Sequence, residues 1–353
     1  MKIKIEQLNV ETFGGCNYRC AMCPQSAPGG RGKDFGKMMP FSIFEKIVLD
    51  AMQYGLKSVS LHGSGEATLH PGLIKMVEFL TKNGLYSSLF TNGLRLNGDL
   101  FERLLDVGFG IVTVSMVGAD RAAYHQWMSR DAFDEIMHNL RECNEIMERH
   151  GTKKGAARHP LTGLPVGVFH TRHLITAPSA DTKAVEREVE VYRRNIIDPL
   201  GCYAEIWMMH NWADQYGQSP CDRASMASSP ERRSCGRPFA ATLEVRAGGL
   251  EGHHGAVVPC PFTLGPKDAE AVLGNLDVQT IAEVMADEPI AKLRQAHMDG
   301  RFDDIPACRG CDMLYQTEVL AWSNIPGRHT GQSKTSNVDY VEAGKEATAI
   351  ATA

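Results

Sequence analysis

The chain has 353 residues, of which 43% are hydrophobic and 22% are charged, which suits a globular protein with one large and one smaller domain. Its formal net charge of −5 gives no electrostatic reason to expect nucleic acid or an anionic membrane as a partner, and we expect neither. No apolar run approaches the roughly 20 residues of a membrane-spanning helix.

Strand-like and helix-like patterns alternate through the first part of the chain. Apolar and β-branched runs predict strands at 8–13, 58–62, 86–91, 111–116, 166–175 and 204–209. Helical spacing predicts helices at 41–54, 72–83, 100–107, 131–149 and 182–195. This alternation indicates an α/β fold of parallel βα units, either a partial (β/α)6 barrel or an open parallel sheet. In both architectures ligands bind at the carboxyl ends of the strands.

The pattern changes after residue 211. Segments become shorter, Gly and Pro become denser, and six of the ten cysteines lie between Cys202 and Cys311. We therefore expect a large domain at 1–211, a smaller domain at 212–325 and a flexible tail at 326–353, where Gly, Ser, Thr and Ala predominate.

The ten cysteines and the N-terminal residues together indicate the cellular compartment and the role of the thiols. The first residues, MKIKIEQLNVET, alternate apolar and polar like a strand and lack the apolar core of a signal peptide. We therefore expect a cytoplasmic protein, whose thiols stay reduced. Ten cysteines in such a compartment indicate metal binding or catalysis rather than disulfides.

Three cysteines, Cys16, Cys20 and Cys23, lie within eight residues in the loop after the first predicted strand. Three thiolates need a fourth ligand from elsewhere to close a tetrahedral zinc site. Alternatively they hold three irons of a four-iron–four-sulfur cluster and leave the fourth iron open to bind another molecule.

The spacing C-x3-C-x2-C after a first strand resembles the defining motif of the radical S-adenosylmethionine (SAM) superfamily. In that family the open iron binds the amino and carboxylate groups of SAM, and one electron cleaves SAM to a 5′-deoxyadenosyl radical. The resemblance therefore implies a partial (β/α)6 radical SAM barrel, one 4Fe-4S cluster that binds SAM, and an external one-electron reductant such as a flavodoxin or ferredoxin.

A second segment of the family's pattern follows the second predicted strand. In HGSGEATLHP, Gly63, Ser64, Gly65 and Glu66 resemble the family's GGEP segment, which binds the SAM amino group. Glycines let backbone carbonyls come close to a ligand, and a carboxylate accepts hydrogen bonds from an ammonium group. Ala67 replaces the usual Pro of the segment.

Three further positions are similar to SAM contacts of the family. Met22 precedes the third cysteine, where relatives often carry an aromatic residue near the adenine. Ser115, at the end of the fourth predicted strand, resembles a serine that contacts the ribose, or it is a capping hydroxyl. Arg172, toward the end of the fifth strand, resembles a basic residue that contacts the SAM carboxylate, or it is a surface arginine. The TNG sequence at 91–93 also fits the family, and fits a plain turn equally well.

The later cysteines resemble a known extension of radical SAM enzymes. The pair CRGC is a local metal signal, and GAVVPCP and VLGNL precede it in the order of the SPASM/twitch domain. No cysteine follows Cys311, as in the shorter twitch version with one auxiliary 4Fe-4S cluster, found in dehydrogenases that act on aminocyclitols. The implied ligands are Cys235, Cys260, Cys308 and Cys311, and the alternative is a zinc ribbon with four cysteine ligands.

Cys202 and Cys221 are left over, and we consider both as donors of a hydrogen atom. Cys221 is alternatively a cluster ligand in place of Cys235, and Cys202 a small buried residue. The resemblance implies a radical SAM oxidoreductase that oxidises a small hydroxylated molecule, such as a sugar or aminocyclitol, with the auxiliary cluster as electron acceptor. The alternatives are an epimerase with a cysteine donor, a maturase that modifies a peptide, and a non-enzymatic zinc-binding module.

Overall fold

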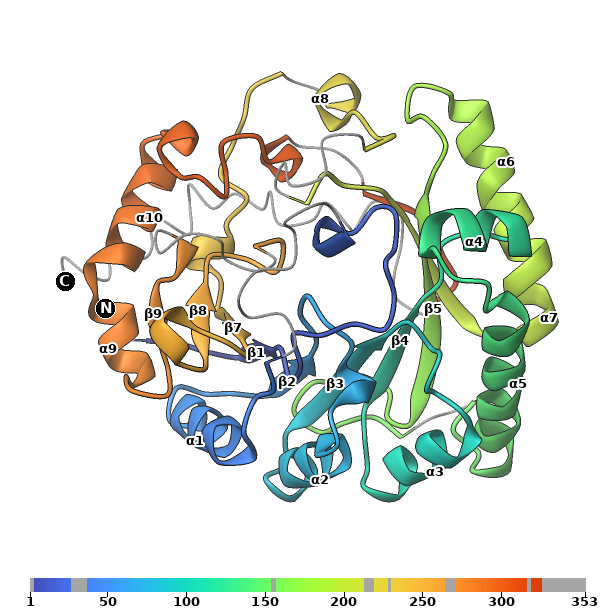
Figure 1. The fold of residues 1–353 in the computed structure, drawn as a ribbon, viewed down its shortest axis with the longest axis horizontal. Coiled ribbons are helices and arrows are strands. Elements are labelled where there is room, and N and C mark those ends of the chain that lie inside the picture. Colours follow the sequence, from blue (N-terminus) through green and yellow to red (C-terminus); the bar gives the residue numbers. More distant parts are fainter. Residues whose placement is uncertain are drawn as a thin grey trace.

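The computed structural model describes residues 3–26, 37–153, 157–212, 219–227, 230–263, 271–315 and 319–325. Ten strands in these residues form one sheet, in the order β10-β6-β5-β4-β3-β2-β1-β7-β8-β9. The sheet curves round a central region, with most helices along its outer side (Figure 1). The loop that follows β1 lies inside the curve.

Six strands of the first part of the chain pair parallel with one another. They are β1 (Gln7–Val10), β2 (Ser58–Leu61), β3 (Tyr86–Thr91), β4 (Ile111–Ser115), β5 (Val168–Ile175) and β6 (Tyr203–Met208). The helices between them are α1 (Phe41–Met52), α2 (Leu73–Lys82), α3 (Gly98–Asp106), α4 (Arg121–Met128), α5 (Phe133–Arg149), α6 (Thr182–Tyr192) and α7 (Asp198–Leu200). A π-helical turn, Arg193–Ile197, joins α6 to α7. This architecture confirms the predicted α/β class and partial barrel.

The strands have two different faces because successive side chains point to opposite sides. Apolar residues such as Val59 and Val112 are fully buried in the hydrophobic core. The other face is polar, and its residues bond across strands: Asn9 Nδ2 donates to Glu244 Oε1 at 2.6 Å, and Thr113 Oγ1 lies 3.3 Å from His170 Nε2. A polar interior of this kind suits a ligand-binding barrel better than a purely structural one.

All six predicted strands and five predicted helices of the first part are present, with ends displaced by a few residues. Helix α4 was missed in the sequence because its eight residues carry little apolar periodicity. Its start is fixed locally, since the Asp120 carboxylate accepts from the Ala123 amide at 2.8 Å.

The second part of the chain continues the same sheet. It contains α8 (Arg223–Met226), β7 (Thr242–Arg246), β8 (Ala256–Val258), β9 (Gly274–Asn275), α9 (Ile281–Ala286), α10 (Glu288–Met298) and β10 (Leu320–Ser323). Strand β7 pairs parallel with β1, β8 and β9 extend it antiparallel, and β10 pairs antiparallel with β6. The predicted boundary near residue 211 stays a prediction, and the predicted flexible tail lies outside the described residues.

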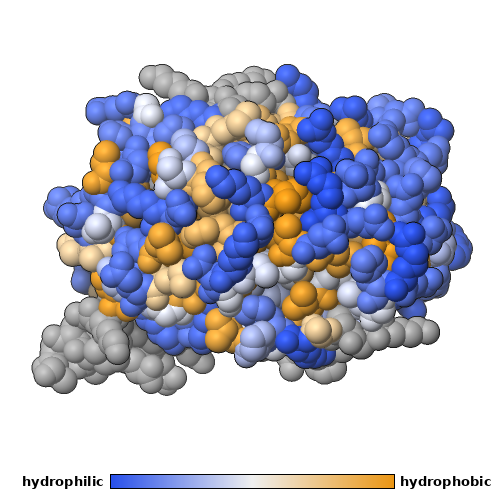
Figure 2. All heavy atoms as spheres, turned by 90° about the horizontal axis from the view of Figure 1, so that it is seen from below, coloured by the Kyte–Doolittle hydropathy of each residue, from blue (hydrophilic) through white to orange (hydrophobic). Residues whose placement is uncertain are grey.

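Short 3-10 turns complete the described secondary structure. They lie at Pro24–Ser26, Ala67–Leu69, Arg237–Phe239, Leu250–Gly252, Phe302–Asp304 and Asp312–Leu314. None of the helices in the described ranges has the length and apolar character needed to cross a bilayer. On the face shown in Figure 2, hydrophobic residues are interspersed with hydrophilic ones, an ordinary surface for a globular protein.

Candidate active site

The N-terminal cysteine set, Cys16, Cys20 and Cys23, lies in the loop after β1, at the carboxyl ends of the parallel strands. All three residues are partly exposed. Burial raises the pKa of Cys16 to about 11 and that of Cys20 well above its usual value. The charges of Glu66 and Cys23 raise the pKa of Cys16 further, and those of Cys23 and Cys16 raise that of Cys20. Three thiols that repel one another as thiolates are stabilised in that form only by a bound cation or cluster.

The arrangement of the three N-terminal cysteines can be compared with that of a site for a single metal ion. Thiolates round one zinc lie about 3.8 Å apart, because each Zn–S bond is about 2.3 Å in a tetrahedron. Within the described ranges, no three His, Cys, Asp or Glu side chains are arranged to hold a metal ion. A cluster spreads its thiolate ligands over separate irons, so an all-sulfur set of three fits a cluster better than one ion.

Helix α4, which the sequence did not reveal, fixes the cysteine loop. The Tyr18 and Tyr124 hydroxyls lie 2.9 Å apart, and the Ala21 amide donates to the Trp127 carbonyl at 2.7 Å. Both Tyr18 and Tyr124 are buried. The loop is therefore positioned by tertiary contacts with α4 rather than by its own turn.

The loop after β2 lies directly against the cysteine loop. The Glu66 amide donates to the Gly15 carbonyl at 2.8 Å. A Cβ at Gly65 would overlap the Phe13 carbonyl oxygen, and one at Gly63 would overlap Glu11. Gly65 is therefore required by a close approach of two backbones, and Gly63 by the Glu11 side chain. Their predicted approach to the SAM amino group stays a prediction.

The Glu66 carboxylate accepts four hydrogen bonds within the protein. It accepts from the Thr68 amide at 3.1 Å, the Thr68 hydroxyl at 2.6 Å, the Thr91 hydroxyl at 2.7 Å and the Asn92 amide at 2.7 Å. Three of these bonds are on Oε1 and one is on Oε2, so Oε2 keeps an acceptor position. Glu66 thus joins the loop after β2 to the TNG segment, which is more than a plain turn: Asn92 Nδ2 also donates to Asn17 Oδ1 at 2.8 Å.

A buried ion pair that the sequence did not reveal connects the two parts of the chain. The Glu11 carboxylate accepts from the Ser64 amide at 2.6 Å and from the Ser64 hydroxyl. Arg246 Nη1 lies 3.8 Å from Glu11, and Arg246 Nη2 donates to the carbonyls of Pro261 and Thr263, both at 2.9 Å. This link runs from the loop after β2 to the segment after Cys260. The only sequence signal was a charged residue at the end of each strand.

Arg172 lies in the barrel interior, so the alternative of a surface arginine is wrong. Its Nη2 donates to Glu205 Oε2 at 2.7 Å, and Glu205 is fully buried. The guanidinium lies over the rings of Phe90 and Trp207, at 4.9 and 5.0 Å. Trp207 Nε1 also donates to Glu205, at 2.9 Å. Contact of Arg172 with a SAM carboxylate stays a prediction.

The other two predicted SAM contacts occupy different environments. Ser115 ends β4 next to Arg172 in the strand register and is half-buried. Met22 is 6% exposed and packs in the hydrophobic core. Their roles toward ribose and adenine stay predictions.

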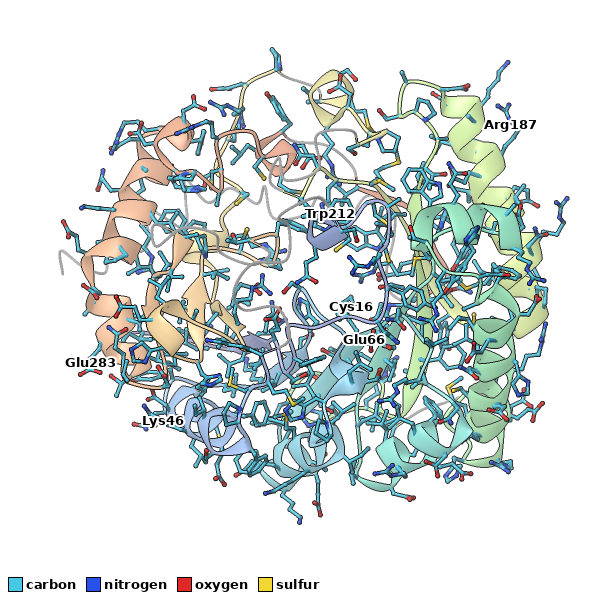
Figure 3. The ribbon with its side chains drawn as sticks, viewed as in Figure 1. Cys16, Lys46, Glu66, Arg187, Trp212 and Glu283 are labelled. Carbon is cyan, nitrogen blue, oxygen red and sulfur yellow. The ribbon has the colours of Figure 1, made fainter. Side chains whose placement is uncertain are left out.

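The barrel interior also holds histidines that stay neutral. Burial lowers the pKa of His62 to about 3, and the nearby charges of Arg246, Arg237 and Arg172 lower it further. The pKa of His210 is also well below its usual value, because of burial first and then of nearby arginines. Cys16, Glu66 and Trp212 lie in the central region that the ribbon encircles (Figure 3).

The C-terminal cysteine set, Cys235, Cys260, Cys308 and Cys311, lines one cavity. Three of the four are buried, and Cys260 is partly exposed. Burial raises the pKa of Cys235 to about 11 and those of Cys308 and Cys311 above their usual value, and charge on the other thiolates adds to each shift. The structure thus brings together all four predicted ligands, from segments up to 76 residues apart.

The two remaining candidate cysteines lie elsewhere. Cys202 precedes β6, so it is at the amino end of the parallel strands, opposite the cysteine loop. The Cys221 thiol is buried 3.6 Å from the Met226 sulfur and does not line the cavity of the C-terminal set. Cys235 rather than Cys221 therefore completes that set. The position of Cys202 does not support a role beside a substrate at the carboxyl ends.

Two family models match the chain. The model of the radical SAM superfamily matches residues 10–154, and the model of an iron–sulfur cluster-binding domain, SPASM, matches residues 252–312. The first match contains the N-terminal cysteine set, and the second contains Cys260, Cys308 and Cys311. These domains take SAM with a 4Fe-4S cluster and auxiliary iron–sulfur clusters, respectively.

Curated relatives match the first part of the chain. The tungsten-containing aldehyde ferredoxin oxidoreductase cofactor-modifying protein of Pyrococcus furiosus is 32% identical over 113 residues, which are 32% of this chain and 31% of that protein. The probable GTP 3′,8-cyclase of Sulfurisphaera tokodaii is 30% identical over 142 residues, 39% of this chain and 43% of that protein. The chain thus spans less than half the length of these relatives.

Solved structures resemble nearly the whole chain. BtrN in complex with AdoMet and 2-DOIA covers 88% of this chain and 94% of its own, with a TM-score of 0.52 and 16% identity. Streptococcus suis SuiB bound to precursor peptide SuiA has a TM-score of 0.58 and 14% identity, and covers 89% of this chain and 71% of its own. The anSMEcpe structure with bound AdoMet has a TM-score of 0.53 and 14% identity, and covers 97% and 91%. At these identities the likeness concerns the fold.

Proposed function

We propose that this chain, which carries a radical SAM domain followed by a SPASM-type domain, is an oxidoreductase that oxidises a small hydroxylated molecule. The observation that supports it is the convergence of Cys235, Cys260, Cys308 and Cys311 on one cavity. A second cluster beside a radical SAM site provides an acceptor for an electron, which an oxidation needs and a redox-neutral reaction does not.

The N-terminal set would hold the SAM-binding cluster, and the loop of Gly63 and Gly65 would place backbone carbonyls at the SAM amino group. Glu66 fixes this loop through its four hydrogen bonds, and it remains a proposed contact to the SAM amino group. Ser115, Arg172 and Met22 remain the proposed contacts to ribose, carboxylate and adenine.

The bound groups together supply a 5′-deoxyadenosyl radical and a one-electron acceptor, so that one hydrogen atom, one proton and one electron leave the alcohol as it becomes a ketone. The chain's own part is to bind and orient the alcohol. Phe90 and Trp207 are partly exposed rings in the barrel interior, and Trp207 Nε1 donates to the buried Glu205 carboxylate. Flat rings beside a carboxylate suit a hydroxylated ring.

The proposal includes the protein's surroundings. The substrate is a small molecule, the reductant is a flavodoxin- or ferredoxin-like protein, and the compartment is the reducing cytoplasm.

The test counts metals and products in the anaerobically purified full chain. We expect roughly eight irons per chain, SAM cleavage on reduction with dithionite, and one 5′-deoxyadenosine per ketone formed from a panel of cyclitols, aminocyclitols and hexoses. A colourless protein that holds zinc would overturn the proposal. Product with unchanged oxidation state and solvent deuterium at carbon would favour an epimerase instead.

A further inference from the structure

His297 is a buried histidine beside the C-terminal cysteine set. It belongs to α10, is 3% exposed and lines the same cavity as the four cysteines. Its Nε2 lies 3.5 Å from the Cys308 sulfur. The motifs identified in the sequence do not include it, and nothing in the sequence near residue 297 distinguishes it from an ordinary helix residue.

A short chain of hydrogen bonds orients this imidazole. The Gly236 amide donates to the Ser234 hydroxyl oxygen at 3.2 Å, and that oxygen lies 3.0 Å from His297 Nδ1. The Ser234 hydroxyl can accept from this amide and at the same time donate its own hydrogen to Nδ1. A neutral imidazole that accepts at Nδ1 carries its hydrogen on Nε2, which is the atom that faces sulfur.

We propose that His297 donates a hydrogen bond from Nε2 to the Cys308 sulfur and thereby raises the reduction potential of the auxiliary cluster. This inference rests on the proposed function, since it requires a cluster on the C-terminal set. Ser234 is the positioning residue that selects the imidazole tautomer. Cys235 follows Ser234 directly, so the ligand and the orienting hydroxyl share one backbone segment.

The physical reason is the extra negative charge that a cluster gains on reduction. A hydrogen bond to a coordinating sulfur stabilises the reduced state more than the oxidised state, because the reduced sulfur is the stronger acceptor. The effect is large here because the cavity is lined mainly by apolar side chains, including Leu293, Met313 and Leu314. A higher potential makes the cluster a better acceptor for an electron from substrate.

The test measures the auxiliary cluster alone. Cys16, Cys20 and Cys23 are changed to alanine in the full chain, so that the first cluster is absent and the remaining signal belongs to the C-terminal set. In this background we compare His297→Leu, His297→Gln and Ser234→Ala with Gln295→Leu, an exposed position on the same helix. The readouts are iron content and the midpoint potential from an EPR-monitored redox titration.

We expect unchanged iron in all variants. The potential of His297→Leu should become clearly more negative, that of His297→Gln should stay near the parent value because its amide can still donate, and that of Ser234→Ala should shift less than that of the leucine variant. Gln295→Leu should match the parent. If His297→Leu does not fold, the midpoint potential of Ser234→Ala tests the proposal instead, and it should be more negative than that of the parent.

Three outcomes contradict the proposal in different ways. Intact iron with an unchanged potential in His297→Leu and Ser234→Ala overturns the hydrogen bond. Loss of iron in His297→Leu, together with nitrogen coupling in the pulsed EPR spectrum of the parent, would make His297 a ligand instead. Absence of iron from the C-terminal set in the parent itself would overturn the proposed function rather than this inference alone.

Discussion

The N-terminal and C-terminal cysteine sets differ in number and in exposure. The first has three thiols, all partly exposed, in a loop at the carboxyl ends of the strands, and the second has four, three of them buried, round a mostly apolar cavity. A centre that binds a ligand needs an open position, and a centre that only passes electrons is better closed to solvent. This difference supports the proposed function, in which the first set serves SAM and the substrate and the second set accepts an electron.

The largest effect should follow from removing the first set. Cys20→Ala should abolish formation of 5′-deoxyadenosine and remove roughly four irons per chain, while the second set keeps its iron. Iron analysis and chromatography of the reduced enzyme with SAM measure both. Cys143→Ala, a buried cysteine of α5 outside both sets, is the control. If Cys20→Ala cleaved SAM at the parent level, the assignment of SAM cleavage to the first set would be wrong.

Removing the second set should separate cleavage from oxidation. With Cys308→Ala and Cys311→Ala together, 5′-deoxyadenosine should still form, but ketone per 5′-deoxyadenosine should fall at least about tenfold, because the electron has no acceptor. The Cys221→Ala enzyme should keep the parent ratio, since Cys221 does not line the cavity. An unchanged ratio in the double variant would mean that the second set is structural.

The link between the two parts can be broken without touching a cysteine. Arg246→Gln leaves the Glu11 carboxylate buried without its ion pair, so the free energy of unfolding should fall by about 3 kcal/mol. The affinity for SAM should fall as well, because Glu11 holds Ser64. Urea unfolding and calorimetric titration with SAM measure these effects, with the exposed Arg103→Gln as control. Unchanged SAM affinity would show that the parts act independently.

The smallest effect concerns acid stability. The pKa of His62 is about 3 in the folded protein, against its usual value of 6.5, so the unfolded state binds the extra proton between these pH values. Lowering the pH through that window therefore destabilises the fold. His62→Gln should reduce the loss of unfolding free energy between pH 7 and pH 5 by at most about 2 kcal/mol. The control is His150→Gln, at an exposed site. An equal reduction in that variant would show that His62 is not the cause of the acid destabilisation.

Much of the site was predictable because its signals are local. The cysteine spacing, the glycines of the loop after β2 and the alternation of strands and helices each depend on neighbouring residues. Gly65 illustrates this: the close approach that requires it is visible only in the structure, but the glycine-rich turn after a strand is visible in the sequence. Helix α4 was missed because contacts such as Tyr18 with Tyr124 stabilise it more than its own pattern does.

The sequence by itself predicted the class of the fold, the spacing of both cysteine sets and the glycine-rich loop after β2. Only the tertiary structure showed that Cys235, and not Cys221, lines the cavity of the second set. It also showed that Glu66 joins the loop after β2 to the TNG segment, and that Glu11 faces Arg246. The physical reason is that the order of the strands in the sheet decides which buried charged groups and thiols lie next to one another. Strand β7 pairs with β1 across 235 residues of chain, and no local pattern encodes that partner.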